Sequence, residues 1–166
     1  AVFNLTGTHE SCMWEKSEGE AETFAVDPDA IPLPPIYPDT PKVRRAMARM
    51  YTQIHNNDRL LGQYLEQLEE DGLADNTVIF HWSDHGPLPR GKRWPYDLGV
   101  HVPMIVRWPE GLEPGSVSDR LISTVDLGPT VLSIAGVEIP WHMQGRAFLG
   151  EQEAPPLSAY TWEQLE

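Results

Sequence analysis

The chain has 166 residues, of which 40% are hydrophobic, so it is long and apolar enough to bury the core of one domain. Its formal net charge of −13 argues against nucleic acid as a partner, because nucleic-acid binding requires clustered lysines and arginines. With 16 prolines and 13 glycines the chain does not suit a helical bundle, and its single cysteine, Cys12, excludes internal disulfides and cysteine-rich zinc sites. No apolar run approaches the roughly 18 residues that a membrane span needs.

The chain starts without the basic segment of a signal peptide. Residues 2–5 are predicted to form a short buried strand that enters a loop, so we expect the chain to begin within a domain. Residues 6–40 show no sustained period, and the proline-rich stretch 31–38 indicates an extended connection packed on the domain.

A long helix is predicted over 41–72. Asp39 or Thr40 can cap it, and Pro41 suits its first position. Gly72 is a typical C-terminal stop. The apolar residues at helical spacing, which are expected to face the core, are Val43, Met47, Met50, Ile54, Leu61, Tyr64, Leu65 and Leu68.

The second half of the chain contains strand signals and one more helix. Residues 77–82 form a continuous apolar run of the kind found inside a parallel sheet, and 102–108 read as another strand. A short helix is predicted over 125–135, ended by Gly136, and a last strand near 157–161.

This order of elements predicts an α/β fold with a mainly parallel sheet flanked by helices. We expect strand 77–82 to lie parallel to strand 102–107, and helix 41–72 to pack on one face of the sheet.

Chemically active residues follow the strand 77–82 directly. Ligands in open α/β sheets bind beyond the carboxyl ends of strands, which is where Asp84 and His85 fall. A carboxylate oxygen and an imidazole nitrogen can both bind a divalent metal, and Gly86 permits a sharp turn. By itself the sequence Asp84-His85-Gly86 is equally compatible with a loop whose side chains make hydrogen bonds within a turn.

Two further residues are candidates for binding an anion. Lys92 lies in a short basic segment, 89–93, that suits a sulfate or phosphate ester, although a solvated basic loop explains the segment alone. His9 follows the first predicted strand and could donate to an ester oxygen or act as an acid, although a lone histidine is more often structural.

Taken together these residues resemble the sulfatase family. Residues 73–93 are similar to the segment that carries a metal site and a lysine in sulfatases, and 4–11 to the segment with a substrate-binding histidine. Residues 102–109, 123–136 and 144–146 resemble three later segments, in the same order and over nearly the whole chain. The closest likeness is to the sulfamidase-like and heparan-sulfatase-like members.

The resemblance implies an alkaline-phosphatase-like α/β fold, with residues 1–166 forming the C-terminal-side part of its catalytic domain. It implies hydrolysis of a sulfate ester or sulfamate in a sulfated small molecule or glycan, by a formylglycine nucleophile and a divalent metal. Asp84 and His85 fall on metal-ligand positions, Lys92 on a sulfate contact, and His9 on a residue that contacts the sulfate or assists the leaving group. Calcium is the expected metal, while the imidazole of His85 also suits manganese or zinc.

The chain departs from the family pattern at the nucleophile. The formylglycine motif is Cys or Ser, any residue, Pro, any residue, Arg, and neither Cys12 nor any serine fits it. We therefore expect the 166 residues to be inactive alone, to bind calcium weakly, and to self-associate through exposed half-domain surface. The resemblance favours a periplasmic, extracellular or lysosomal location.

Two alternative functions remain open from the sequence. A histidine at the position of His85 is also similar to the pattern of the phosphodiester and phosphonate ester hydrolases of the same superfamily, so one of these activities is the first alternative. The acidic surface and the proline-rich stretch could instead serve a non-catalytic binding module. The second alternative predicts that replacing Asp84, His85 and Lys92 leaves binding unchanged.

Overall fold

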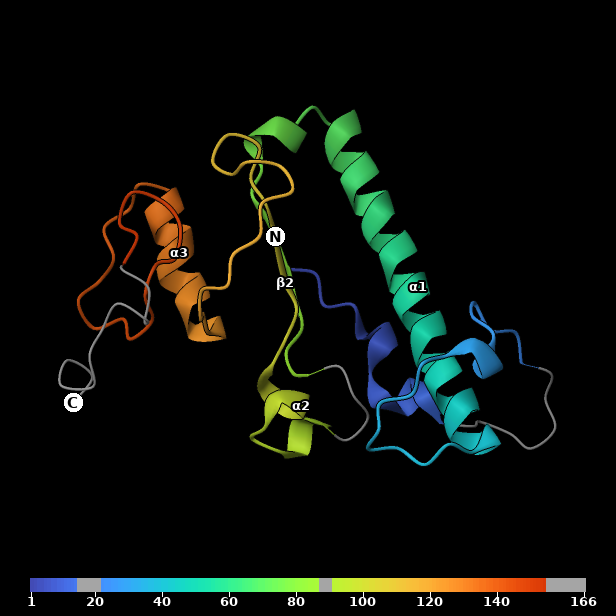
Figure 1. Cartoon of the computed structure of the whole chain (residues 1–166). Coiled ribbons are helices and arrows are strands. Elements are labelled where there is room, and N and C mark those ends of the chain that lie inside the picture. The colour runs from blue at the N-terminus through green and yellow to red at the C-terminus, as the bar shows by residue number, and fades with distance from the viewer. Residues whose placement is uncertain (15–21, 87–90, 155–166) are drawn as a thin grey trace. The chain divides into compact units, whose positions relative to one another are not determined.

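The computed structural model describes residues 1–14, 22–86 and 91–154. The chain forms two compact units, Ala1–Trp108 and Pro109–Glu166. The first unit contains the helices α1 and α2 and the strands β1 and β2, and the second contains α3 (Figure 1). The strand predicted near 157–161 lies outside the described residues.

The long helix α1, Pro41–Glu70, confirms the helix predicted over 41–72. Its start is fixed by Thr40, whose hydroxyl accepts a hydrogen bond from the Val43 backbone N–H at 3.3 Å. Just beyond its end Gly72 adopts φ 66°, in the left-handed region that glycine enters without a steric penalty. Both ends of the helix are therefore set by local sequence signals.

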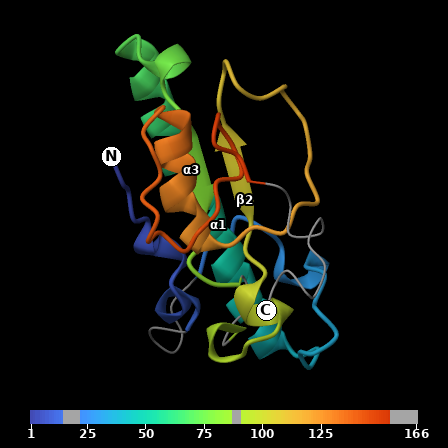
Figure 2. The ribbon, with the colours of Figure 1, turned by 90° about the vertical axis from the view of Figure 1, so that its left-hand side faces the viewer.

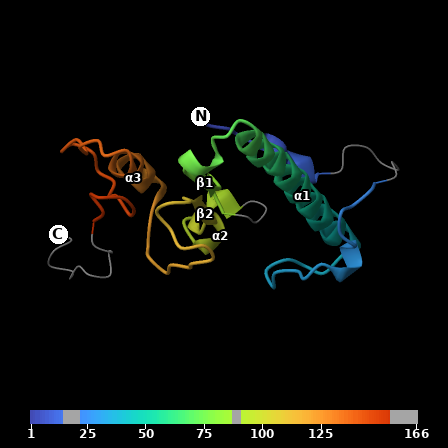
Figure 3. The same ribbon diagram turned by 90° about the horizontal axis from the view of Figure 1, so that it is seen from above.

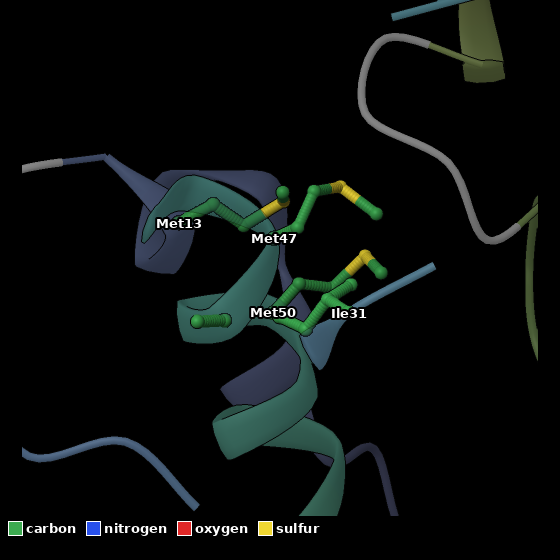
Figure 4. Packing of buried hydrophobic residues seen from close by; sticks show 5 residues of the cluster. Met13, Ile31, Met47 and Met50 are labelled. Atoms are coloured by element: carbon green, nitrogen blue, oxygen red, sulfur yellow. The ribbon is translucent and has the colours of Figure 1, made fainter. Parts of the chain in front are cut away.

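The core of the first unit lies on the first half of α1. Met47, Ala48 and Met50 of the helix pack with Met13, the last residue of a 3-10 helix, and with Ile31, which directly follows another (Figure 4). Methionine side chains are flexible and fill irregular gaps, which suits a layer of short 3-10 segments joined by loops. The apolar residues in the first half of α1 are thus covered by short 3-10 segments, and the packing of the helix on a sheet face stays a prediction.

Arg44 fastens the segment before α1 to the helix. Its guanidinium donates to the backbone carbonyl oxygens of Pro28, Asp29 and Ile31 at 3.2, 3.0 and 3.3 Å. It also forms a two-point ion pair with Asp39, and this hydrogen bond lowers the pKa of the Asp39 carboxyl. The extended connection expected before the helix is therefore packed on the unit.

The N-terminal residues do not form the strand that was predicted over 2–5. Val2 is 86% exposed and Phe3 is 61% exposed, with the Phe3 ring stacked on Tyr64 at a centroid distance of 4.5 Å. Two 3-10 helices follow, Thr6–Thr8 and Glu10–Met13. A strand needs an edge to pair with, and in the described part of the chain the only sheet is β1–β2.

Strands β1, Ile79–Trp82, and β2, Met104–Arg107, lie side by side and pair antiparallel (Figures 2 and 3). The predicted parallel pairing of these two strands was wrong. In its described residues, the connection between them contains a 3-10 helix, Gly91–Arg93, and a short helix, α2 (Asp97–Val100), but no long crossover helix of the kind that parallel neighbours use. The mainly parallel sheet of the complete fold stays a prediction.

The β1–β2 ribbon is also less buried than an interior strand. Trp82 is 39% exposed and Ile105 is 63% exposed, so apolar side chains of both strands reach the surface of the ribbon. Such surface agrees with the expectation of self-association, which itself stays a prediction.

The second unit is built on α3, Leu127–Ile134, which confirms the short helix predicted over 125–135. Gly136 ends it with φ 65°. The chain after the helix runs back along it (Figure 2), where the Thr130 hydroxyl accepts from the Phe148 N–H at 3.1 Å and Ser133 from the Gln152 N–H at 2.8 Å. Among the described residues, no helix combines the length and the apolar character needed to cross a bilayer.

Candidate functional site

His9 is held in one orientation by its own turn. Its Nδ1 accepts a hydrogen bond from the backbone N–H of Ser11 at 3.3 Å and lies 2.9 Å from the Ser11 hydroxyl. A backbone N–H can only donate, so Nδ1 carries no proton, and in the neutral ring the proton is on Nε2. His9 therefore presents an N–H donor on the side of the ring that faces away from the turn.

Lys92 lies next to the Nε2–H donor of His9, although it is distant in the sequence. Its Nζ lies 3.5 Å from His9 Nε2, although the two residues are 83 positions apart. An ammonium group only donates, and in this tautomer Nε2 also donates, so the two groups do not satisfy each other. Both can instead donate to one anionic oxygen placed between them. The structure thus brings the two predicted anion-binding residues together.

Three glycines shape the connection that carries Lys92. The Gly86 N–H donates to the Gly99 carbonyl at 2.9 Å, and a Cβ on either Gly86 or Gly91 would collide with the Leu98 carbonyl oxygen. The sequence predicted that Gly86 permits a sharp turn. The structure shows a different reason why this position requires glycine. Its φ is not positive, and the glycine is needed because two backbone segments approach closely there.

Asp84 and His85 form a second pair on the same connection. The Asp84 side chain is 88% exposed, and its Oδ1 lies 3.9 Å from His85 Nε2. His85 Nδ1 lies 2.9 Å from the Gly86 carbonyl oxygen, which can only accept, so Nδ1 carries the proton and the lone pair is on Nε2. Two ligands of one ion, each at about 2.0–2.5 Å from the metal, can lie this far apart.

Asp84 and His85 therefore have the right chemistry to bind a metal ion, but they supply only part of a ligand set. Across residues 1–14, 22–86 and 91–154, no three His, Cys, Asp or Glu side chains lie close enough together to hold a metal ion. The two pairs are connected through the backbone, because Gly86 and Gly91 both pack against the Leu98 carbonyl. Within the same ranges no hydrogen bond or ion pair joins Asp84 or His85 directly to His9 or Lys92.

Glu10 is a residue of this site to which sequence reasoning gave no role. Its Oε1 lies 3.5 Å from Lys92 Nζ, so the same ammonium contacts both His9 and a carboxylate. Glu10 adjoins His9 in the sequence, and that adjacency is the available signal. The pairing with Lys92 depends on a long-range contact, which no local pattern indicates.

The comparisons with known proteins identify the family. A family model described as Sulfatase matches residues 2–137, most of the chain. The chain belongs to the sulfatase family. It is 39% identical over 184 residues to the "Ulvan-active sulfatase" of Formosa agariphila, a match that covers 91% of this chain and 31% of the relative. It is 33% identical over 146 residues to the "N-sulphoglucosamine sulphohydrolase" of Homo sapiens, covering 81% of this chain and 29% of that one.

A solved structure supports the same assignment. It is the structure of a protein in complex with its substrate D-Glucosamine-2-N, 6-O-disulfate, with a TM-score of 0.62 and 31% sequence identity, and the match covers 70% of this chain and 25% of that one. These matches confirm the sulfatase resemblance and its heparan-sulfatase-like character, and they agree with part of an alkaline-phosphatase-like α/β fold. The chain spans about three tenths of the length of the curated relatives it matches.

Proposed function

We propose that this chain forms the part of a sulfuric ester hydrolase that binds the sulfate group. In the complete protein the reaction would be metal-dependent hydrolysis of a sulfate ester or sulfamate on a sugar. The observation that carries the proposal is the convergence of two hydrogen-bond donors, Lys92 Nζ and His9 Nε2, at 3.5 Å.

The chemistry of the two donors suits an ester sulfate. Such a group carries one negative charge spread over three terminal oxygens. Lys92 would supply a charge-assisted hydrogen bond to one oxygen, and the His9 Nε2–H would donate to the same oxygen or to the atom that links sulfur to the sugar. In the second arrangement His9 would act as a general acid that protonates the departing group. Ser11 keeps the ring in the required tautomer in both cases.

Asp84 and His85 would hold the metal through a carboxylate oxygen and Nε2. When bound, a divalent cation supplies charge that polarises a sulfate oxygen. Calcium takes about six to eight oxygen ligands, so further ligands must come from outside this pair. We expect calcium to bind the 166 residues weakly, and isothermal titration that gave a sub-micromolar affinity would contradict this. Asp84→Ala should remove the metal from the complete protein, as measured by its metal content.

The nucleophile would also come from outside these residues. No Cys or Ser in the 166 residues fits the formylglycine motif, and Cys12 is followed by Met13 and Trp14, where the motif requires Pro at the second of these positions. We propose that the 166 residues do not turn over sulfate esters alone. Robust turnover that is abolished by Cys12→Ala would contradict the proposal.

A sulfated sugar is the proposed substrate class. The relatives named above include a sulfatase active on ulvan and a sulphohydrolase of N-sulphoglucosamine, and the solved structure holds a glucosamine disulfate. A location outside the cytoplasm is proposed from membership of the family.

The test uses the complete protein with D-glucosamine-2-N,6-O-disulfate as substrate and release of sulfate as the readout. Lys92→Met and His9→Gln should each lower kcat/KM by about 100-fold or more, because each removes a donor to developing negative charge. Lys42→Met is the matched control, since Lys42 is an exposed lysine in the first turn of α1, and it should stay within about twofold of the unmodified protein. Equal activity in all three variants would refute the proposed site.

A further inference from the structure

The lysine of the proposed sulfate site also contacts a carboxylate. Glu10 Oε1 lies 3.5 Å from Lys92 Nζ, and the two side chains are 19% and 32% exposed. Glu10 begins the 3-10 helix Glu10–Met13 and directly follows His9. A negative charge this close to the lysine weakens the attraction of the site for anions, so the carboxylate must have another role.

We infer that Glu10 is a specificity-determining residue, whose negative charge lowers the affinity of the site for a doubly charged phosphate monoester relative to that for a singly charged sulfate ester. The inference rests on the proposed function, because it assumes that the anion binds between Lys92 and His9. It deepens that proposal by giving the site a preference between two esters of the same shape.

The charges on the site's side chains support this preference. Lys92 contributes one positive charge, Glu10 one negative charge, and His9 in the tautomer set by Ser11 none. The three side chains therefore offer donors for hydrogen bonds with little net positive charge. A sulfate ester carries a single negative charge, whereas a phosphate monoester carries close to two above its second pKa of about 6.

The distances give the size of the effect. An ester oxygen that accepts from Lys92 Nζ puts its central atom about 4 Å from the nitrogen, and so no more than about 8 Å from Glu10 Oε1. For the one additional negative charge of a phosphate ester, repulsion at that distance corresponds to a factor of about 2 in affinity in water and about 30 at an effective dielectric constant of 20.

A purely structural role of Glu10 makes a different prediction. If the carboxylate only steadies Lys92, its loss weakens sulfate and phosphate binding by the same factor, because both ligands use the same ammonium. The ratio of the two dissociation constants therefore separates electrostatic selection from positioning.

The experiment measures the dissociation constants of phenyl sulfate and phenyl phosphate for the 166-residue chain at about pH 7.5, where phenyl phosphate carries close to two charges. In Glu10→Gln the ratio of the phosphate to the sulfate constant should fall by about 2- to 30-fold. Glu10→Asp keeps the charge and should keep the ratio. Glu66→Gln, which removes the same charge from an exposed position of α1, should also keep it.

Each outcome decides between the alternatives. A ratio that stays constant in Glu10→Gln, with both ligands still dependent on Lys92, overturns the inference and leaves the proposed function standing. If Lys92→Met binds both ligands as well as the unmodified chain does, the proposed function fails, and the inference fails with it.

Discussion

Met13 anchors the segment that carries His9, and Met13→Ala tests whether this anchor positions the site. Met13 is the buried residue of the 3-10 helix Glu10–Met13, at 3% exposure. It packs with Met47 of α1, and its backbone carbonyl accepts from Arg49 at 3.1 Å. Truncation to alanine removes the thioether but leaves that hydrogen bond in place.

The expected loss follows from the burial. Large-to-small changes from methionine to alanine in a closed core lower the free energy of unfolding by about 2–5 kcal/mol. Met13 lies in a short turn that can partly collapse onto the helix, so we expect the lower end, about 2–3 kcal/mol. Urea unfolding followed by far-ultraviolet circular dichroism measures it, and binding of phenyl sulfate should weaken in parallel because His9 loses its support.

Met13→Leu is the matched control. Leucine keeps the apolar volume, so the change in stability should stay below about 1.5 kcal/mol, with phenyl sulfate binding retained. If Met13→Ala changed the free energy of unfolding by less than about 0.5 kcal/mol, the contact between this segment and α1 would not hold the site together.

Four further substitutions test the packing of the first unit. Arg44→Lys should destabilise the chain by about 1–3 kcal/mol in urea unfolding, because an ammonium cannot replace a guanidinium that contacts three carbonyl oxygens and a carboxylate. Hydrogen bonding to Arg49 lowers the pKa of Glu22 below its ordinary 4.5, so the stability that this carboxylate contributes is present above that pH and lost as the pH falls through the lowered pKa. A thermal unfolding series from pH 6 to 3 should therefore show a loss in the unmodified chain that is smaller in Glu22→Gln. Gly99→Ala should destabilise the connection carrying the site, because its Cβ would overlap two backbone carbonyl oxygens, whereas Gly62→Ala, with open space around it in α1, should stabilise the chain by up to about 1 kcal/mol.

The parts of the fold that the sequence predicted well are set by local signals. Helix α1 starts where Thr40 caps it and stops where Gly72 takes a positive φ, and both effects act within one turn. The same holds for the end of α3 at Gly136.

The antiparallel pairing of β1 with β2 could not be predicted from local sequence signals. An apolar, β-branched run predicts a strand, but its partner and direction depend on how the connection folds back. That connection includes close backbone approaches at Gly86 and Gly99, which no local pattern indicates. The strand predicted over residues 2–5 is missing for a related reason, since a strand needs an edge to pair with and the part of the chain that the structure describes offers none beside these residues.

The candidate site was likewise predicted only in part. Asp84 and His85 are adjacent in the sequence, so their proximity follows from the chain itself. The convergence of His9 and Lys92 was expected only from the resemblance to sulfatases, because 83 residues separate them. Nothing in the local pattern around Glu10 indicated its ion pair with Lys92, which arises from the same long-range contact.

The central claim is that His9 and Lys92 together bind the sulfate group, and a crystal structure of the chain with a bound sulfate ester tests it most directly. The account predicts terminal or bridging oxygens of the ester within about 3.2 Å of both His9 Nε2 and Lys92 Nζ, with the Ser11 N–H still on His9 Nδ1. An ester bound elsewhere, or a His9 ring turned so that Nε2 faces away from Lys92, would contradict it.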